Sequence, residues 1–130
     1  MSNCNAYIFF DGNCAEAMQF YEKTLGGSLR MVKGSDMPNG SGDAIMHAHL
    51  ALNGGGVLMG SDWMDPANPF PGRHGYRVFV AFPTIEEAQR VFNALAEGGS
   101  VHMPFAKTFW SEGFGMVNDR FGTPWMVQKE

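Results

Sequence analysis

An internal repeat places the strongest constraint on what this chain can fold into. In the first half, an apolar run precedes an amphipathic segment that begins with Asn13-x-x-Glu16 and stops at paired glycines. The second half repeats this order, and its amphipathic segment begins with Thr84-x-x-Glu87. An Asn or Thr followed three residues later by Glu is typical of a helix N-terminus, because both side chains can accept bonds from unpaired backbone N–H groups. The repeat therefore predicts two copies of one unit.

Length and composition limit the classes of function. The 130 residues are 45% hydrophobic and 17% charged, which is ordinary for a globular domain, and half of the chain is too short to bury a sufficient core alone. A net charge of −4 without a basic cluster argues against nucleic acid as a partner. No apolar run approaches the ~18 residues of a membrane span, and the N-terminus lacks a signal pattern. We therefore expect a cytoplasmic protein without a membrane partner, in which Cys4 and Cys14 are reduced thiols.

Hydrophobic periodicity and turn residues predict the same order of elements in both halves. In the first half we expect a helix over 14–25, a loop over 34–43, and strands over 5–11, 28–33, 44–52 and 57–61. In the second half we expect a helix over 85–95 and strands over 76–82, 100–105, 114–118 and 123–128. Within a single domain of residues 1–130, module 1 then covers about 4–62, a linker about 63–74, and module 2 about 75–130.

The order β-α-β-β-β, present twice, predicts an α+β fold of two tandem βαβββ modules. Each module is expected to have a curved mixed sheet with one helix on its outside. Because one helix cannot cover both faces of a four-stranded sheet, the other face must remain available. We expect that face to form a concave cup that is open to a ligand, or else to be covered by a partner.

Short motifs spread over nearly the whole chain carry a family resemblance. They comprise residues 7–17, Phe20-Tyr21, Leu25-Gly26-Gly27, Met46-His47-Ala48-His49-Leu50, residues 58–62, Phe109-Trp110 and Asp119-Arg120-Phe121-Gly122-Thr123-Pro124-Trp125. Together they resemble the glyoxalase/bleomycin-resistance superfamily, also called vicinal oxygen chelate proteins, and within it the PhnB-like branch. The resemblance implies a homodimer with a cup around the paired modules. It also implies a divalent metal that acts as a Lewis acid and is held by four residues, from the first and last strands of each module.

The four positions that correspond to the metal ligands carry no suitable donors. By alignment, the first-strand positions fall at Ala6 and Arg77, and the last-strand positions at Met59 and Met126. Alanine has no donor atom, arginine is a permanent cation, and a thioether suits soft ions. We therefore expect a small-molecule-binding protein of the glyoxalase/bleomycin-resistance type with a degenerate metal site and no resident cofactor.

The histidines of the first module offer an alternative metal site. His47 and His49 stand at positions i and i+2 of an expected strand, so they share a face with a spacing that can hold zinc. A third ligand would come from Asp62, His74 or Glu112. In that case the protein is a metal-dependent lyase or isomerase, so the sequence leaves open whether it is an enzyme. Two surface histidines with ordinary hydrogen bonds are the simpler explanation.

Several other side chains are candidates for ligand contact. Arg77 stands among apolar neighbours and needs an anion if it faces the cup, although a salt bridge to Asp62 or an exposed position would also satisfy it. Met59 and Met126 either line an apolar site or pack in the core. The residues Trp63, Phe109 and Trp110 lie in expected loops. Their rings suit stacking on a small organic ligand, anionic or aromatic, or contact between two chains, which would make the protein a structural dimerisation module.

Overall fold

The computed structural model describes residues 4–38, 40 and 42–130, and these residues form two βαβββ modules. Module 1 contains β1 (Ala6–Phe10), α1 (Cys14–Leu25), β2 (Ser28–Lys33), β3 (Ile45–Ala51) and β4 (Val57–Asp62). Module 2 contains β5 (Val78–Phe82), α2 (Ile85–Ala96), β6 (Ser100–Ala106), β7 (Phe114–Asn118) and β8 (Pro124–Lys129). The expected loop over 34–43 begins with a short 3-10 helix, Gly34–Asp36, and its positions 39 and 41 lie outside the described residues. The chain divides into two compact units between Pro71 and Gly72.

Each module has a four-stranded mixed sheet, as the order of elements predicts. The strand order is β1-β4-β3-β2 in module 1 and β5-β8-β7-β6 in module 2. In both sheets the first and last strands of the module pair in parallel, whereas the other neighbours are antiparallel. The parallel pairing follows from the helix, which carries the chain across the sheet after the first strand. The predicted fold class is therefore confirmed.

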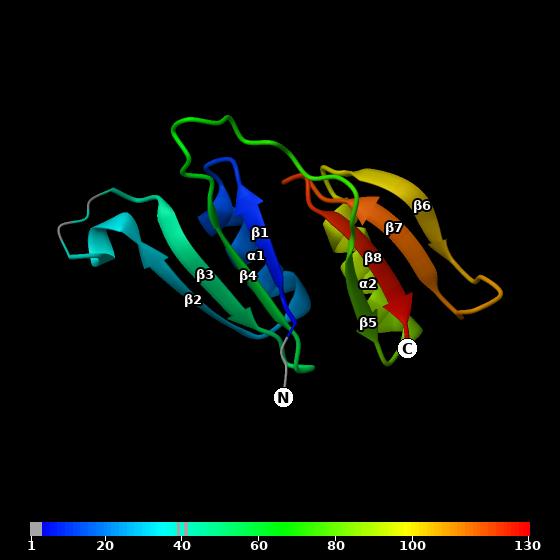
Figure 1. Ribbon diagram of the computed structural model, residues 1–130. Helices are drawn as coiled ribbons and strands as arrows, with labels where there is room; N and C mark the ends of the chain where they lie inside the picture. Colours follow the sequence, from blue (N-terminus) through cyan, green and yellow to red (C-terminus); the bar gives the residue numbers. More distant parts are fainter. Residues whose placement is uncertain (1–3, 39, 41) are drawn as a thin grey trace. The chain divides into compact units, whose positions relative to one another are not determined.

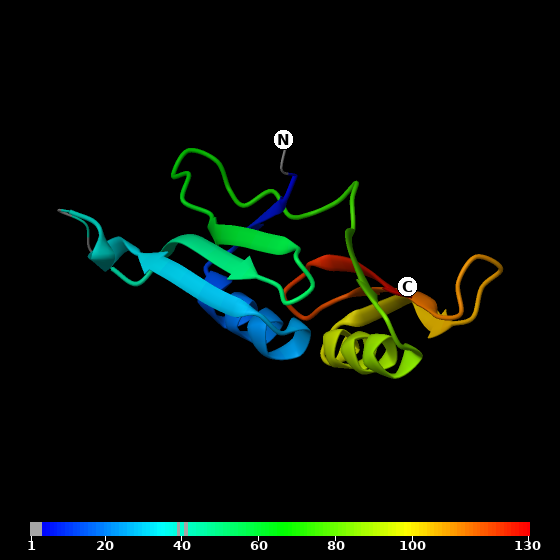
Figure 2. The ribbon, with the colours of Figure 1, turned by 90° about the horizontal axis from the view of Figure 1, so that it is seen from below.

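In each module the helix packs against one face of its own sheet (Figures 1 and 2). The apolar residues of α2 that follow one another at spacings of three or four, or lie next to each other on one face, are buried: Ala88, Val91, Phe92 and Leu95. The opposite face of each sheet remains accessible: Tyr7 and Phe9 are 40% and 44% exposed, and Phe79 is 52% exposed. We call this the open face of each module. Nowhere in the described chain is a helix long and apolar enough to cross a membrane.

The two helices begin in different ways, although their sequences predict the same cap. At α2 the Thr84 hydroxyl accepts a bond from the Glu87 N–H, as expected. The Glu87 carboxylate pairs with Arg90 instead of Thr84, and this hydrogen bond lowers the pKa of Glu87 below its ordinary value. At α1 the prediction is wrong, because Asn13 makes no side-chain cap bond. Its role is taken by Asp62, at the end of β4.

Asp62 joins three elements of module 1 on the helix-covered side of the sheet. Its Oδ1 accepts from the Cys14 N–H at the start of α1, at 2.9 Å, and its Oδ2 accepts from the Ile45 N–H at the start of β3, at 2.8 Å. Asp62 as a whole is 7% exposed. An anion at a helix N-terminus also interacts favourably with the helix dipole. Asp62 therefore fixes the first turn of α1 relative to the sheet.

This arrangement predicts opposite outcomes for two alanine substitutions. Asp62→Ala leaves two buried N–H groups without a protein acceptor and is expected to lower the free energy of unfolding by about 1–3 kcal/mol. Asn13→Ala is the matched control and should change it by less than about 0.5 kcal/mol. Urea unfolding followed by circular dichroism measures both values. A larger loss for Asn13→Ala than for Asp62→Ala would contradict the assignment of the cap.

Candidate functional site

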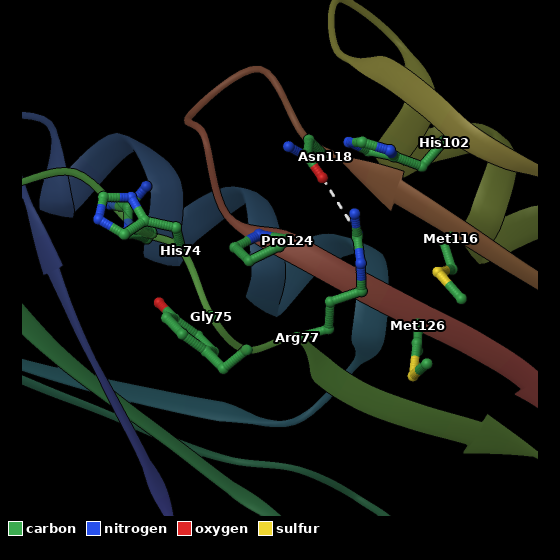
Figure 3. A pocket seen from close by; sticks show the side chains of 10 residues that line it. His74, Gly75, Arg77, His102, Met116, Asn118, Pro124 and Met126 are labelled. Atoms are coloured by element: carbon green, nitrogen blue, oxygen red, sulfur yellow. Dashed lines mark hydrogen bonds between the residues drawn. The ribbon is translucent and has the colours of Figure 1, made fainter.

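The open face of module 2 carries a cavity of about 560 Å³ (Figure 3). Three parts of the module build it. The segment that leads into β5 forms one wall, His102 on β6 stands opposite, and the floor comes from alternate residues of β7 and β8. The floor residues are Met116, Asn118, Pro124 and Met126. Because side chains alternate along a strand, the residues between them, such as Val117 and Trp125, point to the helix side and are buried in the core.

Arg77 is the half-buried cation of this cavity. It lies one residue before β5, and its Nη1 donates to the Asn118 Oδ1 at 3.0 Å and to the Trp125 carbonyl oxygen at 3.2 Å. A longer contact of 3.5 Å joins the same atom to the Val117 carbonyl oxygen. All these acceptors are neutral, and the described residues provide no carboxylate partner for the guanidinium. Nη1 therefore anchors the side chain, while Nη2 and Nε remain available to a ligand.

The lining of the cavity is basic, although the protein as a whole is acidic. Arg73, His74 and His102 line it together with Arg77, and no Asp or Glu occurs among its described lining residues. Arg73 donates from Nη1 to the Phe121 carbonyl oxygen at 2.7 Å, which draws the segment before β5 onto the turn between β7 and β8. Because Arg77 has no carboxylate partner among the described residues and basic side chains surround it, such a site favours an anion.

Asp119 is adjacent in sequence to the cavity residue Asn118, but its own hydrogen bonds keep its carboxylate out of the cavity. Asp119 is 4% exposed. Its Oδ1 accepts from the N–H groups of Phe121 and Thr123, and its Oδ2 accepts from the Trp125 indole N–H at 2.9 Å. The carboxylate thus holds the turn that shapes one end of the cavity, and it does not line the space where a ligand would bind.

Methionines supply the apolar part of the same surface. Met116 and Met126 are paired across β7 and β8, and both line the cavity. Met126 is also paired with Phe79 on β5, which is exposed on the open face. Flexible thioether side chains adapt to irregular shapes, so this floor suits the apolar portion of a ligand whose charged end lies at Arg77.

The structure corrects the first-strand position in module 1. Ala6 is paired with Leu58, and both lie on the helix-covered side of the sheet together with Ile8. The residue beside Met59 on the open face is Tyr7. A shift of one residue along a strand reverses the face to which a side chain points, so a site on the open face would take Tyr7, and not Ala6, from β1.

The three loop aromatics of the sequence analysis lie outside this cavity. Trp63 follows β4 in module 1, contacts the ring of Phe9 edge-on with centroids 5.4 Å apart, and donates from its indole to the Asn68 carbonyl oxygen. Phe109 and Trp110 lie between β6 and β7 and contact each other edge-on. Phe109 is 97% exposed. Their predicted contact with a ligand stays a prediction.

His47 and His49 share the open face of module 1, as their spacing predicts, but two of the three expected third ligands, Asp62 and Glu112, are engaged elsewhere. Asp62 bonds backbone N–H groups on the opposite face, and Glu112 forms a salt bridge with Lys129 at 3.0 Å. In the described part of the chain, no three His, Cys, Asp or Glu side chains are grouped so that they could hold a metal ion. The Nδ1 of His47 is instead 3.2 Å from the Tyr7 hydroxyl.

Sequence reasoning missed His102, Asn118 and Arg73 as parts of the Arg77 cavity, and it considered His74 only as a metal ligand. Arg73 and His74 are in the stretch that the composition marks as a linker, and His102 is an exposed residue of an edge strand. The sequence signal that could have located the cavity is the basic pair Arg73 and His74, which stands just before the apolar run of β5. His102 on β6 and Asn118 on β7 join the cavity through strand pairing, which the sequence does not display.

Comparison with known proteins assigns the chain to a family. Residues 4–127 match the model described as Glyoxalase/Bleomycin resistance protein/Dioxygenase superfamily. Protein YjdN of Escherichia coli K12 is 33% identical over 136 aligned positions, which cover 93% of this chain and 90% of that protein. Protein PA1353 from Pseudomonas aeruginosa is 44% identical, with a TM-score of 0.92 and coverage of 100% of this chain and 98% of that one. The PhnB protein from Bacillus cereus is 26% identical, with a TM-score of 0.77 and coverage of 99% and 100%, so the resemblance to the PhnB-like branch is confirmed.

The environment of Arg77 predicts that its removal is tolerated by the fold. A half-buried guanidinium without a counter-ion contributes little to stability, since its desolvation offsets its hydrogen bonds to neutral acceptors. We expect Arg77→Met to change the free energy of unfolding by less than about 1 kcal/mol in low-salt urea unfolding. A loss above about 3 kcal/mol would mean that Arg77 is a structural residue and not one held for a ligand.

Proposed function

The chain belongs to the glyoxalase/bleomycin resistance protein/dioxygenase superfamily, and we propose that it is a small-molecule-binding member whose ligand is an organic anion. The observation that carries this proposal is the Arg77 guanidinium, which is half-buried in a basic cavity without a carboxylate partner among the described residues. Charge left uncompensated in a protein interior is costly, and sites that retain it commonly recognise the opposite charge.

The cavity suggests how such a ligand is oriented. The anionic group lies at Nη2 and Nε of Arg77, where two parallel N–H groups match the two oxygens of a carboxylate or phosphoryl group. His102 and His74 add donors at the rim. The apolar part of the ligand lies on Met116 and Met126. A volume of about 560 Å³ is in the range of cavities that hold small organic molecules.

We further propose that the superfamily metal site is degenerate in this chain. On the open faces, the first-strand residues beside Met59 and Met126 are Tyr7 and Phe79, and this set provides no carboxylate or imidazole for a hard divalent ion. Under this proposal the protein needs no resident metal. We also expect a homodimer, for which the exposed rings of Phe109 and Trp110 offer apolar contact area.

The proposed ligand class is tested with benzoate and benzamide, which have similar shapes but differ in charge. We expect isothermal titration calorimetry to detect binding of benzoate to the protein but no binding of benzamide. Arg77→Gln should weaken benzoate binding by about 10- to 100-fold, because it removes hydrogen bonds to a charged group, whereas Arg77→Lys should retain part of the affinity.

Arg90→Gln is the matched control, because it removes one positive charge from the exposed face of α2 in the same module. Its affinity for benzoate should equal that of the parent protein. Equal binding of benzoate and benzamide, or equal losses in Arg77→Gln and Arg90→Gln, would overturn the proposal of an anion site at Arg77.

The degenerate metal site is tested by elemental analysis of protein purified from medium that contains zinc and nickel. We expect far less than one ion per chain, and an unchanged melting temperature after treatment with EDTA, because metal bound to the folded state would stabilise it. A content near one ion per chain that falls in His47→Ala/His49→Ala would instead support a metal-dependent lyase or isomerase.

A further inference from the structure

Matching rows across the two open faces carry different chemistry. In module 2 the row across β5, β8 and β7 is formed by Phe79, Met126 and Met116. In module 1 the matching row across β1, β4 and β3 is formed by Tyr7, Met59 and His49, and Arg30 on β2 extends it. The apolar row of module 2 is thus replaced in module 1 by a row with a hydroxyl, an imidazole and a guanidinium.

These polar groups border a cavity of their own. It has a volume of about 500 Å³ and lies at the β2–β3 side of the module 1 sheet, where Arg30, His47 and His49 line it with Met31 and Val32. No Asp or Glu occurs among its described lining residues. Both histidines are half-buried, and the described chain offers the exposed Arg30 no ion-pair partner. The cavity is therefore basic without internal neutralisation.

A hydrogen bond orients one of the histidines. The Tyr7 hydroxyl lies 3.2 Å from Nδ1 of His47, and the two rings have centroids 5.6 Å apart. When the hydroxyl donates, Nδ1 is the acceptor and Nε2 carries the ring proton. His47 then presents an N–H donor on the side of the ring away from Tyr7. A tyrosine that fixes an imidazole in this way prepares a donor for a bound oxygen atom.

From these observations we infer that module 1 carries a second anion site, separate from the Arg77 cavity, formed by Arg30, His47 and His49. Its ligand is a small hydrophilic oxyanion, carboxylate or phosphoryl, because Tyr7, His49 and Arg30 give the row beside the cavity a hydroxyl, an imidazole and a guanidinium. This site does not depend on the function proposed for module 2, since no residue is common to the two cavities.

The histidines provide a reporter for each cavity. The sequence contains four, and two line each cavity: His47 and His49 in module 1, His74 and His102 in module 2. The probe is sodium malate, a small hydrophilic dicarboxylate, titrated at constant pH and at an ionic strength held with sodium chloride. Two-dimensional 1H–13C NMR of the imidazole groups follows all four side chains, and His47→Gln and His49→Gln assign the signals of module 1.

We expect malate to shift the signals of His47 and His49 in a saturable way. Arg30→Gln should weaken that response by about tenfold or more, through loss of a charged hydrogen-bonding partner, and leave the response of His74 and His102 to benzoate unchanged. Arg77→Gln should have the reverse effect. Tyr7→Phe should also weaken malate binding, because His47 loses the bond that orients it.

Three outcomes separate this inference from the function proposed for module 2. Saturable shifts of His47 and His49 with malate, while His74 and His102 stay silent with benzoate, would support the module 1 site and count against the module 2 site. No response of His47 and His49 beyond that to sodium chloride would overturn the module 1 site. Loss of all four responses in both Arg30→Gln and Arg77→Gln would also overturn it, because the two cavities would then act as one site.

Discussion

In each module the packing of a helix against one face of a four-stranded sheet divides the side chains into two groups with different constraints. On the helix side, space is limited. A Cβ atom on Gly60 would lie 2.7 Å from the Ile8 carbonyl oxygen, and one on Gly115 would lie 2.6 Å from the Phe92 ring. On the open face no such packing restricts the choice of residue, so the two modules can differ in chemistry while they keep the same fold. Matching positions accordingly hold His49 in one module and Met116 in the other.

The same division explains how an acidic protein can present two basic cavities. The net charge is −4, yet two carboxylates that lie close in sequence to open-face residues, Asp62 and Asp119, are used on the helix side or in a turn. Asp62 receives N–H groups from α1 and β3, and Asp119 receives those of its own turn and the Trp125 indole. Both are buried. Their hydrogen bonds stabilise the modules and at the same time keep negative charge away from Arg77 and Arg30.

Much of the fold could be predicted because its signals are local. The spacing of Ala88, Val91, Phe92 and Leu95 identifies a buried helix face without any tertiary information. One error arose where a distant residue satisfies a helix N-terminus. Asn13 has the chemistry of a cap but makes no side-chain cap bond, and the N–H group of Cys14 is bound by Asp62, 48 residues away in sequence. The position of Ala6 shows the other limit: a strand pattern of period two identifies two faces, and an alignment error of one residue exchanges them.

The sequence by itself determined the repeat, the order of elements and the buried stripe of α2. These follow from residue type and short-range periodicity. Tertiary structure decided which side chains meet. Arg77 lies beside Asn118 and the Trp125 carbonyl because β8 pairs with both β5 and β7, and Tyr7 reaches His47 because β4 separates β1 from β3 by one strand. No local pattern encodes these neighbours, since strand register joins residues about 40 to 50 positions apart.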